Sequence, residues 1–184
     1  MKGDFSADAP NKKWLTDITQ TPCKDGKLYI APIMDCFGGE IIALAMDDNM
    51  KKELCIKALR EAYELRKPGD GILNRSDSGS QYTSKAYKIE LAGHHALQSM
   101  SGVGKCYDNA RMESFFATLK KEKLYRIDTT NLKMEEVKKI VWRFVVYYNR
   151  RRITTMNPNG YPPAIYRQMF EAGLVKWLKN LRKT

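Results

Sequence analysis

The sequence has little of what zinc-binding and membrane proteins need. Its 184 residues contain only two histidines, which are adjacent, and four scattered cysteines with no Cys-x-x-Cys pair, so zinc-finger spacing is absent. Scattered thiols of this kind are expected to be reduced, as in a cytoplasm. No apolar run reaches the length of a membrane span, and the first residues lack the apolar core of a signal peptide. The composition therefore predicts a globular, cytoplasmic protein.

Acidic residues are scarce in the last third of the chain. Residues 1–119 hold 16 Lys/Arg and 16 Asp/Glu, whereas residues 120–184 hold 16 against 5, which accounts for the whole net charge of +11. A basic excess serves solubility in any protein. Its concentration in one part of the chain favours a polyanionic partner.

Apolar patterns and turn signals predict an α/β fold. Strands are expected at residues 13–19, 28–34, 41–46, 72–74 and 96–100. Helices are expected at residues 51–66, 84–92, 108–123, 132–148 and 164–170, with a basic amphipathic tail at 174–183. Pro32 cannot donate a hydrogen bond to a neighbouring strand, so we expect a bulge or a non-bonded position there.

This order of elements is typical of a ribonuclease-H-like core. Three antiparallel strands come first, and two parallel strands with helical crossovers follow. We therefore predict a five-stranded mixed sheet flanked by helices, with a helical C-terminal extension. The expected boundaries are an N-terminal tail at 1–12, the core at 13–125 and a basic extension at 126–184 that packs on the core.

Three acidic residues are candidates for a metal site. Asp77 lies in a Ser/Gly turn between a strand and a helix, where α/β folds present ligand-holding side chains, although an Asp in such a turn is more often a turn former. Asp17 lies in a mostly uncharged strand, where a buried unpaired acid would be costly. Glu113 is by itself an ordinary helix residue. Asp35, at the end of an apolar strand, is interpreted as structural or supporting.

The motifs around these acids resemble those of bacterial insertion-sequence transposases of the OrfB type, whose core is similar to that of retroviral integrases. The resemblance rests on Trp-x-x-Asp-Ile-Thr at 14–19, Ser-Asp-x-Gly-x-Gln-Tyr-Thr-Ser at 76–84 and Asp-Asn-Ala-x-x-Glu-Ser-Phe-Phe at 108–116. Thirty-five residues separate Asp77 from Glu113, which is the acid spacing of that group. Arg75 and Thr154 stand where relatives often carry His.

The resemblance implies a DDE transposase or integrase core that cleaves DNA and transfers a 3′-hydroxyl strand. It implies two Mg²⁺ ions, replaceable by Mn²⁺, held by Asp17, Asp77 and Glu113. Two alternatives stay open: a ribonuclease-H-like nuclease that only hydrolyses, and a non-catalytic DNA-binding remnant of a transposase. Gln81 and Asn109 match motif positions that could orient substrate or a loop.

Five basic residues are candidates for DNA contact, namely Lys105, Lys120, Arg150, Arg151 and Arg152. A solvated surface charge explains any single lysine equally well. The resemblance further implies a homo-oligomer acting on terminal inverted repeats and target DNA in the bacterial nucleoid. A dozen residues before the first strand are too few for a helix-turn-helix module. We therefore expect a helix-turn-helix partner polypeptide or a missing N-terminal domain, and little preference of this chain alone for terminal repeats.

Overall fold

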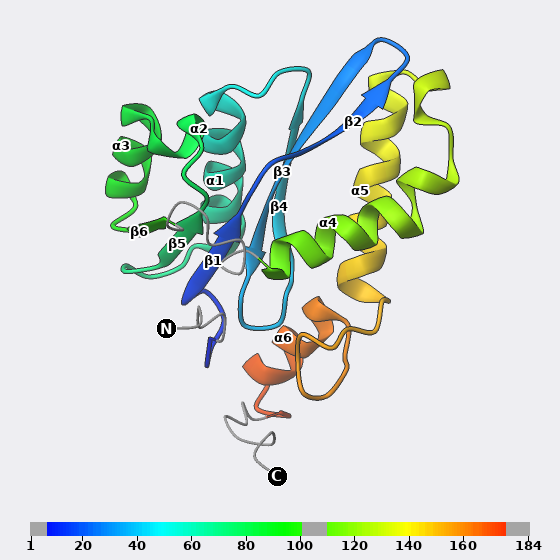
Figure 1. Cartoon of the computed structure of the whole chain (residues 1–184). Coiled ribbons are helices and arrows are strands. Elements are labelled where there is room, and N and C mark those ends of the chain that lie inside the picture. The colour runs from blue at the N-terminus through cyan, green and yellow to red at the C-terminus, as the bar shows by residue number, and fades with distance from the viewer. Residues whose placement is uncertain (1–6, 101–109, 176–184) are drawn as a thin grey trace.

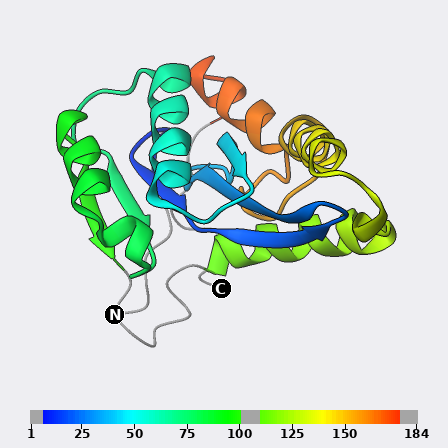
Figure 2. The same ribbon diagram turned by 90° about the horizontal axis from the view of Figure 1, so that it is seen from above.

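The computed structural model describes residues 7–100 and 110–175. A mixed sheet forms its centre, and helices cover both faces (Figures 1 and 2). The candidate residues Lys105 and Asn109 lie outside the described residues, as does most of the predicted tail at 174–183. No helix in the described ranges is long and apolar enough to cross a membrane.

The sheet has the predicted sequence of antiparallel and then parallel strands. Its strands are β1 (Lys13–Thr16), β2 (Thr19–Cys23), β3 (Gly26–Asp35), β4 (Ile41–Asp47), β5 (Leu73–Ser76) and β6 (Leu97–Met100). β3 is antiparallel to β4 on one side and to β1 and β2 in succession on the other. β5 pairs in parallel with β1, and β6 pairs in parallel with β5.

The sheet contains six strands rather than five, because the strand predicted at 13–19 ends at Thr16 and an unpredicted strand, β2, follows it at Thr19–Cys23. β1 and β2 share one register along β3, and continuing that register puts Asp17 opposite Pro32. Proline has no N–H to offer, so the ladder is interrupted at this point. The carbonyl of Pro32 instead accepts a hydrogen bond from the Thr16 hydroxyl at 3.1 Å. The expected irregularity at Pro32 is confirmed, and it leaves Asp17 between two strands.

The predicted helices are confirmed, with ends that differ by a few residues. They are α1 (Lys52–Arg66), α2 (Ser80–Thr83), α3 (Lys85–Gly93), α4 (Ala110–Glu122), α5 (Met134–Arg150) and α6 (Pro163–Glu171), with 3₁₀ turns η2 (Leu124–Arg126) and η3 (Thr129–Asn131). The single turn α2 was not predicted. It ends at Ser84, whose hydroxyl accepts a hydrogen bond from the backbone N–H of Tyr87 at 3.3 Å and so caps α3.

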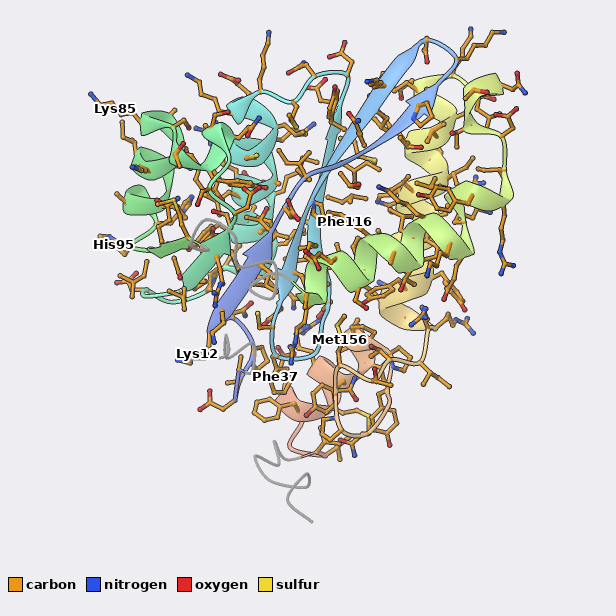
Figure 3. All side chains as sticks on the ribbon, in the orientation of Figure 1. Lys12, Phe37, Lys85, His95, Phe116 and Met156 are labelled. Atoms are coloured by element: carbon orange, nitrogen blue, oxygen red, sulfur yellow. The ribbon has the colours of Figure 1, made fainter. Side chains whose placement is uncertain are left out.

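Two apolar layers enclose the sheet, because neighbouring residues of a strand point to opposite faces. Trp14 packs with the buried residues of α1 and α3, and Leu15 packs with those of α4 and α5. Val141 of α5 is fully buried in the same cluster as Leu15, so the basic region after residue 126 packs directly on the sheet. At the far end of that layer, Phe37 stacks on Tyr166 of α6 with ring centroids 4.9 Å apart (Figure 3).

Candidate active site

Two of the three predicted acids lie together at one edge of the sheet. β1 and β5 run in parallel with Leu15 opposite Arg75, so Asp17 and Asp77 each follow two residues later, just past the carboxyl ends of neighbouring strands. The Asp17 side chain is half-buried and the Asp77 side chain is exposed. Parallel strands thus bring together two carboxylates that are far apart in the sequence.

Backbone N–H groups orient both carboxylates. Oδ1 of Asp17 accepts a hydrogen bond from the N–H of Ile18 at 2.7 Å, and Oδ1 of Asp77 accepts one from the N–H of Gly79 at 3.0 Å. A carboxylate oxygen has further lone pairs beyond the one used in each bond. Oxygen donors of this kind are the ligands that Mg²⁺ and Mn²⁺ prefer, so this pair fits a hard divalent cation.

Cys55 of α1 lies within electrostatic range of both acids. Burial, with a smaller contribution from the negative charges of Asp77 and Asp17, raises the pKa of the Cys55 thiol to about 12. The Cys55 thiol also interacts with the hydroxyl of Tyr82, which lies in α2, five residues after Asp77. That hydroxyl lies 3.2 Å from the Thr16 hydroxyl, beside Asp17. A buried polar contact therefore joins the two segments that carry the acids.

Glu113 lies in the first turn of α4, and its side chain is exposed. The buried side of that turn carries Met112 and Phe115, which pack in the same apolar cluster as Leu15 of β1. Within the described ranges, no three His, Cys, Asp or Glu side chains are close enough to hold one ion. The structure thus pairs Asp17 with Asp77 and leaves Glu113 outside a completed cluster.

Gly79 was not predicted as a site residue, yet its lack of a side chain shapes the Asp77 turn. A Cβ at this position would lie 3.0 Å from Oδ1 of Asp77 and 3.0 Å from Oε1 of Gln81. Its φ of −60° is open to any residue, so a side chain here would be limited by the space beside Asp77 and Gln81 and not by backbone conformation. The Ser-Asp-x-Gly-x-Gln motif contained the signal, but only the tertiary contacts give its reason.

Comparison with known proteins assigns the family. Two models of the integrase core domain match the chain, one over residues 7–106 and the other over residues 95–153. An uncharacterized transposase-like protein from Haemophilus influenzae is 38% identical over 169 residues, which are 91% of this chain and 76% of that protein. The chain belongs to the integrase core domain family.

Relatives of this integrase core include proteins named as insertion-sequence transposases. The candidate transposase InsK for element IS150 of Escherichia coli is 36% identical over 91% of the chain, and the transposase for element IS904 of Lactococcus lactis is 39% identical over 81%. The chain spans 58% of the length of each of these relatives. The resemblance inferred from the three motifs is confirmed.

Solved structures confirm the ribonuclease-H-like fold of this integrase core. The HTLV-2 integrase catalytic core domain in complex with magnesium matches with a TM-score of 0.65 at 18% identity, over 85% of this chain and 96% of that one. A simian T-cell lymphotropic virus intasome in complex with PP2A regulatory subunit B56 gamma matches with a TM-score of 0.75 at 18% identity, over 97% of this chain and 61% of that one.

Asp35 of this integrase core is a structural acid, as expected from the sequence. It is 2% exposed, and its two oxygens accept backbone hydrogen bonds from Asn11 at 2.8 Å and from Phe37 at 3.0 Å. Burial raises the pKa of Asp35 to about 6. Because β3 is antiparallel to β1, Asp35 pairs with Trp14 near the start of β1, away from Asp17.

Gln81 holds a loop. Its side-chain amide donates a hydrogen bond to the backbone carbonyl of Met50 at 2.9 Å, which ties α2 to the segment before α1. Lys120 is half-buried on α4, two turns after Glu113. Of the roles considered for Gln81, positioning a loop agrees with this contact, and the candidate role of Lys120 in DNA contact stays a prediction.

The three consecutive arginines that end α5 have different surroundings. Arg152 donates two hydrogen bonds to the Glu122 carboxylate. One joins Nη2 to Oε1 at 2.7 Å, and the other joins Nε to Oε2 at 3.1 Å. Arg151 lines the same groove as this pair, between α4 and α5, whereas Arg150 lines a hollow beside α1. Arg152 therefore fastens α5 to α4, and the three do not form one surface.

Three residues that flank these arginines, Tyr148, Asn149 and Thr154, also have structural roles. The Asn149 side chain accepts a hydrogen bond from the N–H of Ile41 at 3.0 Å and donates one to its carbonyl at 2.8 Å, so it completes the backbone pairing of β4. Tyr148 is buried in the core. Thr154, which replaces the His of relatives, is buried and accepts a hydrogen bond from the N–H of Met156 at 3.2 Å.

Proposed function

We propose that this chain is the catalytic core of a DDE transposase. Its reaction would be metal-dependent cleavage of a DNA strand followed by transfer of the 3′-hydroxyl to a second phosphodiester, without a covalent protein–DNA intermediate. The observation that carries the proposal is the pair of carboxylates, Asp17 and Asp77, at the ends of neighbouring parallel strands. Family membership and relatives named as transposases support it.

Asp17, Asp77 and Glu113 are the proposed metal ligands. Two Mg²⁺ ions, or Mn²⁺ in their place, would supply activation of the attacking oxygen and neutralisation of the leaving oxygen. Asp17, Asp77 and Glu113 would hold these ions through their carboxylate oxygens. The N–H groups of Ile18 and Gly79 fix the two aspartates in orientation before any ligand arrives.

The proposed substrate is DNA, both the terminal inverted repeats of an element and its target. The excess of 16 basic over 5 acidic residues in 120–184 supports a polyanionic substrate. Assembly as a homo-oligomer on DNA is proposed by analogy with the matched viral proteins, a simian T-cell lymphotropic virus intasome and a trimeric form of the HTLV-2 integrase catalytic core. A helix-turn-helix polypeptide or a domain outside this sequence is proposed to find the element ends.

A strand-transfer assay tests the proposal. Labelled repeat-end duplex and plasmid target are incubated with Mg²⁺ and wild-type protein, Asp77→Asn or the matched control Asp70→Asn, which changes an exposed acid on the loop before β5. Asp77→Asn is expected to abolish cleavage and joining, as are Asp17→Asn and Glu113→Gln, while the control keeps both. Near-normal activity of a folded Asp77→Asn protein would remove that residue from the site. If the wild-type protein cleaves DNA without joining it, the result would favour the alternative of a nuclease that only hydrolyses. If it binds DNA without cleaving it, the result would favour a non-catalytic DNA-binding remnant of a transposase.

A further inference from the structure

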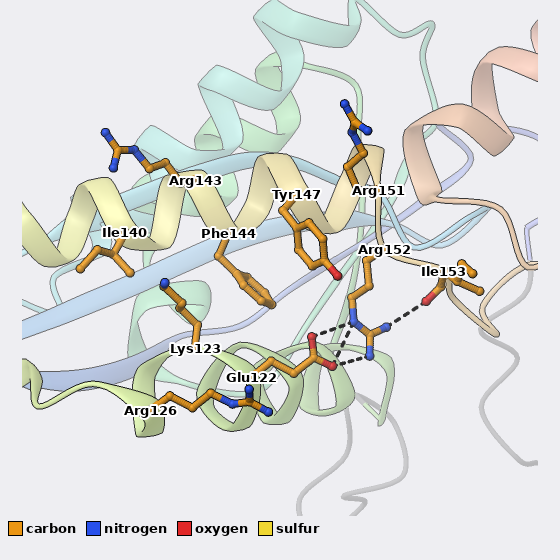
Figure 4. Close-up of a pocket in the computed structure, with 10 residues that line it drawn as sticks. All are labelled: Glu122, Lys123, Arg126, Ile140, Arg143, Phe144, Tyr147, Arg151, Arg152 and Ile153. Atoms are coloured by element: carbon orange, nitrogen blue, oxygen red, sulfur yellow. Dashed lines mark hydrogen bonds and ion pairs between the residues drawn. The ribbon is translucent and has the colours of Figure 1, made fainter.

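A groove separates the end of α4 from α5, on a part of the molecule that the proposed reaction does not use. Its volume is about 830 Å³. Tyr147 reaches from α5 toward α4, and Lys123 reaches from the end of α4 toward α5 (Figure 4). The residues that matter here are Lys123, Arg126, Arg143, Tyr147, Arg151 and Ile153.

The groove has a surplus of positive charge. Its single acid, Glu122, is already bound by Arg152, and the hydrogen bonds from that guanidinium lower the pKa of the Glu122 carboxyl. Lys123, Arg143 and Arg151 form no ion pair within the described part of the chain. With Arg126 they give four cations among the residues that line the groove; the side chains of Arg143 and Arg151 extend from α5 away from α4 and so flank its outer rim (Figure 4). A surplus of positive charge is the pattern of a site for a polyanion.

Exposed apolar groups accompany these cations. The Tyr147 side chain is 49% exposed, and that of Ile153 is 75% exposed. Phe144 lies beside Tyr147, with ring centroids 6.2 Å apart, and Ile140 continues the same wall. A face that served only solubility would not expose an aromatic ring between cations. A ring beside cations suits a nucleic-acid base stacked next to its phosphates.

We propose that this groove binds a single-stranded segment of DNA. Backbone phosphates would contact the four cations, and one base would stack on Tyr147. Glu122 follows Glu113 by nine residues, so the groove begins about 13.5 Å farther along α4 and half a turn around it. The groove therefore lies on another flank of α4 than Glu113, and it adds a second nucleic-acid surface to the proposed function.

Fluorescence anisotropy in EDTA tests the charge of the groove, with a labelled 12-nucleotide oligothymidine, a 12-base-pair duplex and polyglutamate as probes. Lys123→Ala/Arg143→Ala removes one cation from each wall. The matched control, Lys57→Ala/Lys88→Ala, removes two exposed cations from α1 and α3. Each lost phosphate contact is expected to flatten the log–log salt slope by about 0.7 for single strands, so the groove variant loses about 1.4 and the control none.

Substitutions of Tyr147 test whether a DNA base stacks on its ring. Tyr147→Ala is expected to weaken oligothymidine binding about 5- to 150-fold, whereas Tyr147→Phe keeps the ring and the affinity. Equal slopes for the groove variant and its control would overturn the proposal. A Tyr147→Ala loss that is equal for duplex would indicate a duplex backbone site, and tighter binding of polyglutamate an acidic protein partner; either result overturns it. EDTA prevents metal-dependent catalysis, so this outcome is independent of the strand-transfer assay.

Discussion

The substitution Gly79→Ala is expected to shift the Asp77 carboxylate at the candidate active site without unfolding the protein. The backbone of Gly79, with φ −60° and ψ 150°, suits alanine without strain. The new Cβ would lie 3.0 Å from an oxygen of Asp77 and 3.0 Å from an oxygen of Gln81, which is closer than such contacts normally come. The Asp77 side chain is exposed and yields by a few tenths of an ångström, so the carboxylate moves while the fold stays intact.

The expected magnitudes have opposite signs for stability and activity. Alanine in place of glycine at a compatible position raises the free energy of unfolding by about 0.4–1 kcal/mol, because the unfolded chain loses freedom. A displacement of ~1 Å in an active site costs roughly 100-fold in rate, so a few tenths are expected to cost on the order of 3- to 10-fold. The Mg²⁺ concentration for half-maximal cleavage should rise for the same reason.

Single-turnover DNA cleavage and urea unfolding measure the two effects on the same preparations. Gly69→Ala is the matched control, because a Cβ at Gly69 would meet nothing within 4 Å. The control is expected to cleave at the wild-type rate. If Gly79→Ala cleaves as fast as Gly69→Ala, the Asp77 turn is not sensitive to crowding. If it instead loses more than ~1 kcal/mol of stability, the substitution acts on the fold and the reasoning is refuted.

Three further predictions concern residues that the structure assigns to the fold. Asn149→Ala should lower the free energy of unfolding by about 2–4 kcal/mol in urea, because it leaves the N–H and carbonyl of Ile41 without these partners; a loss under ~1 kcal/mol would contradict it. Arg152→Ala, which breaks the Glu122 pair, should cost about 1 kcal/mol and leave the salt slope of DNA binding unchanged, whereas a flatter slope would return this arginine to the DNA surface. Burial raises the pKa of Asp35 from 3.8 to about 6, so its ionisation opposes folding above that pH. Stability relative to Asp35→Asn should therefore rise by about 2 kcal/mol between pH 7 and pH 4.5, and a flat difference would exclude the shift.

Much of the fold and the identity of the candidate acids could be predicted from the sequence. Strands and helices follow from apolar periodicity and turn residues, which are local, so the order of three antiparallel and two parallel strands was predictable. Asp17 and Asp77 were predictable because each occupies a recognisable motif next to a strand. The interruption between β1 and β2 at Asp17 could not be predicted, because it depends on Pro32, which lies on a different strand.

Only the tertiary structure determined which neighbours each side chain contacts. Arg150 lines a hollow beside α1, whereas Arg151 and Arg152 follow the end of α5 and line the α4–α5 groove, where Arg152 binds the Glu122 carboxylate. The sequence alone suggests that a run of charged residues forms one surface patch. The direction of each side chain and the neighbours that it contacts depend on tertiary packing and cannot be inferred from the local sequence. The same holds for the α4–α5 groove, whose cations come from helices that only the packing of α4 against α5 brings side by side.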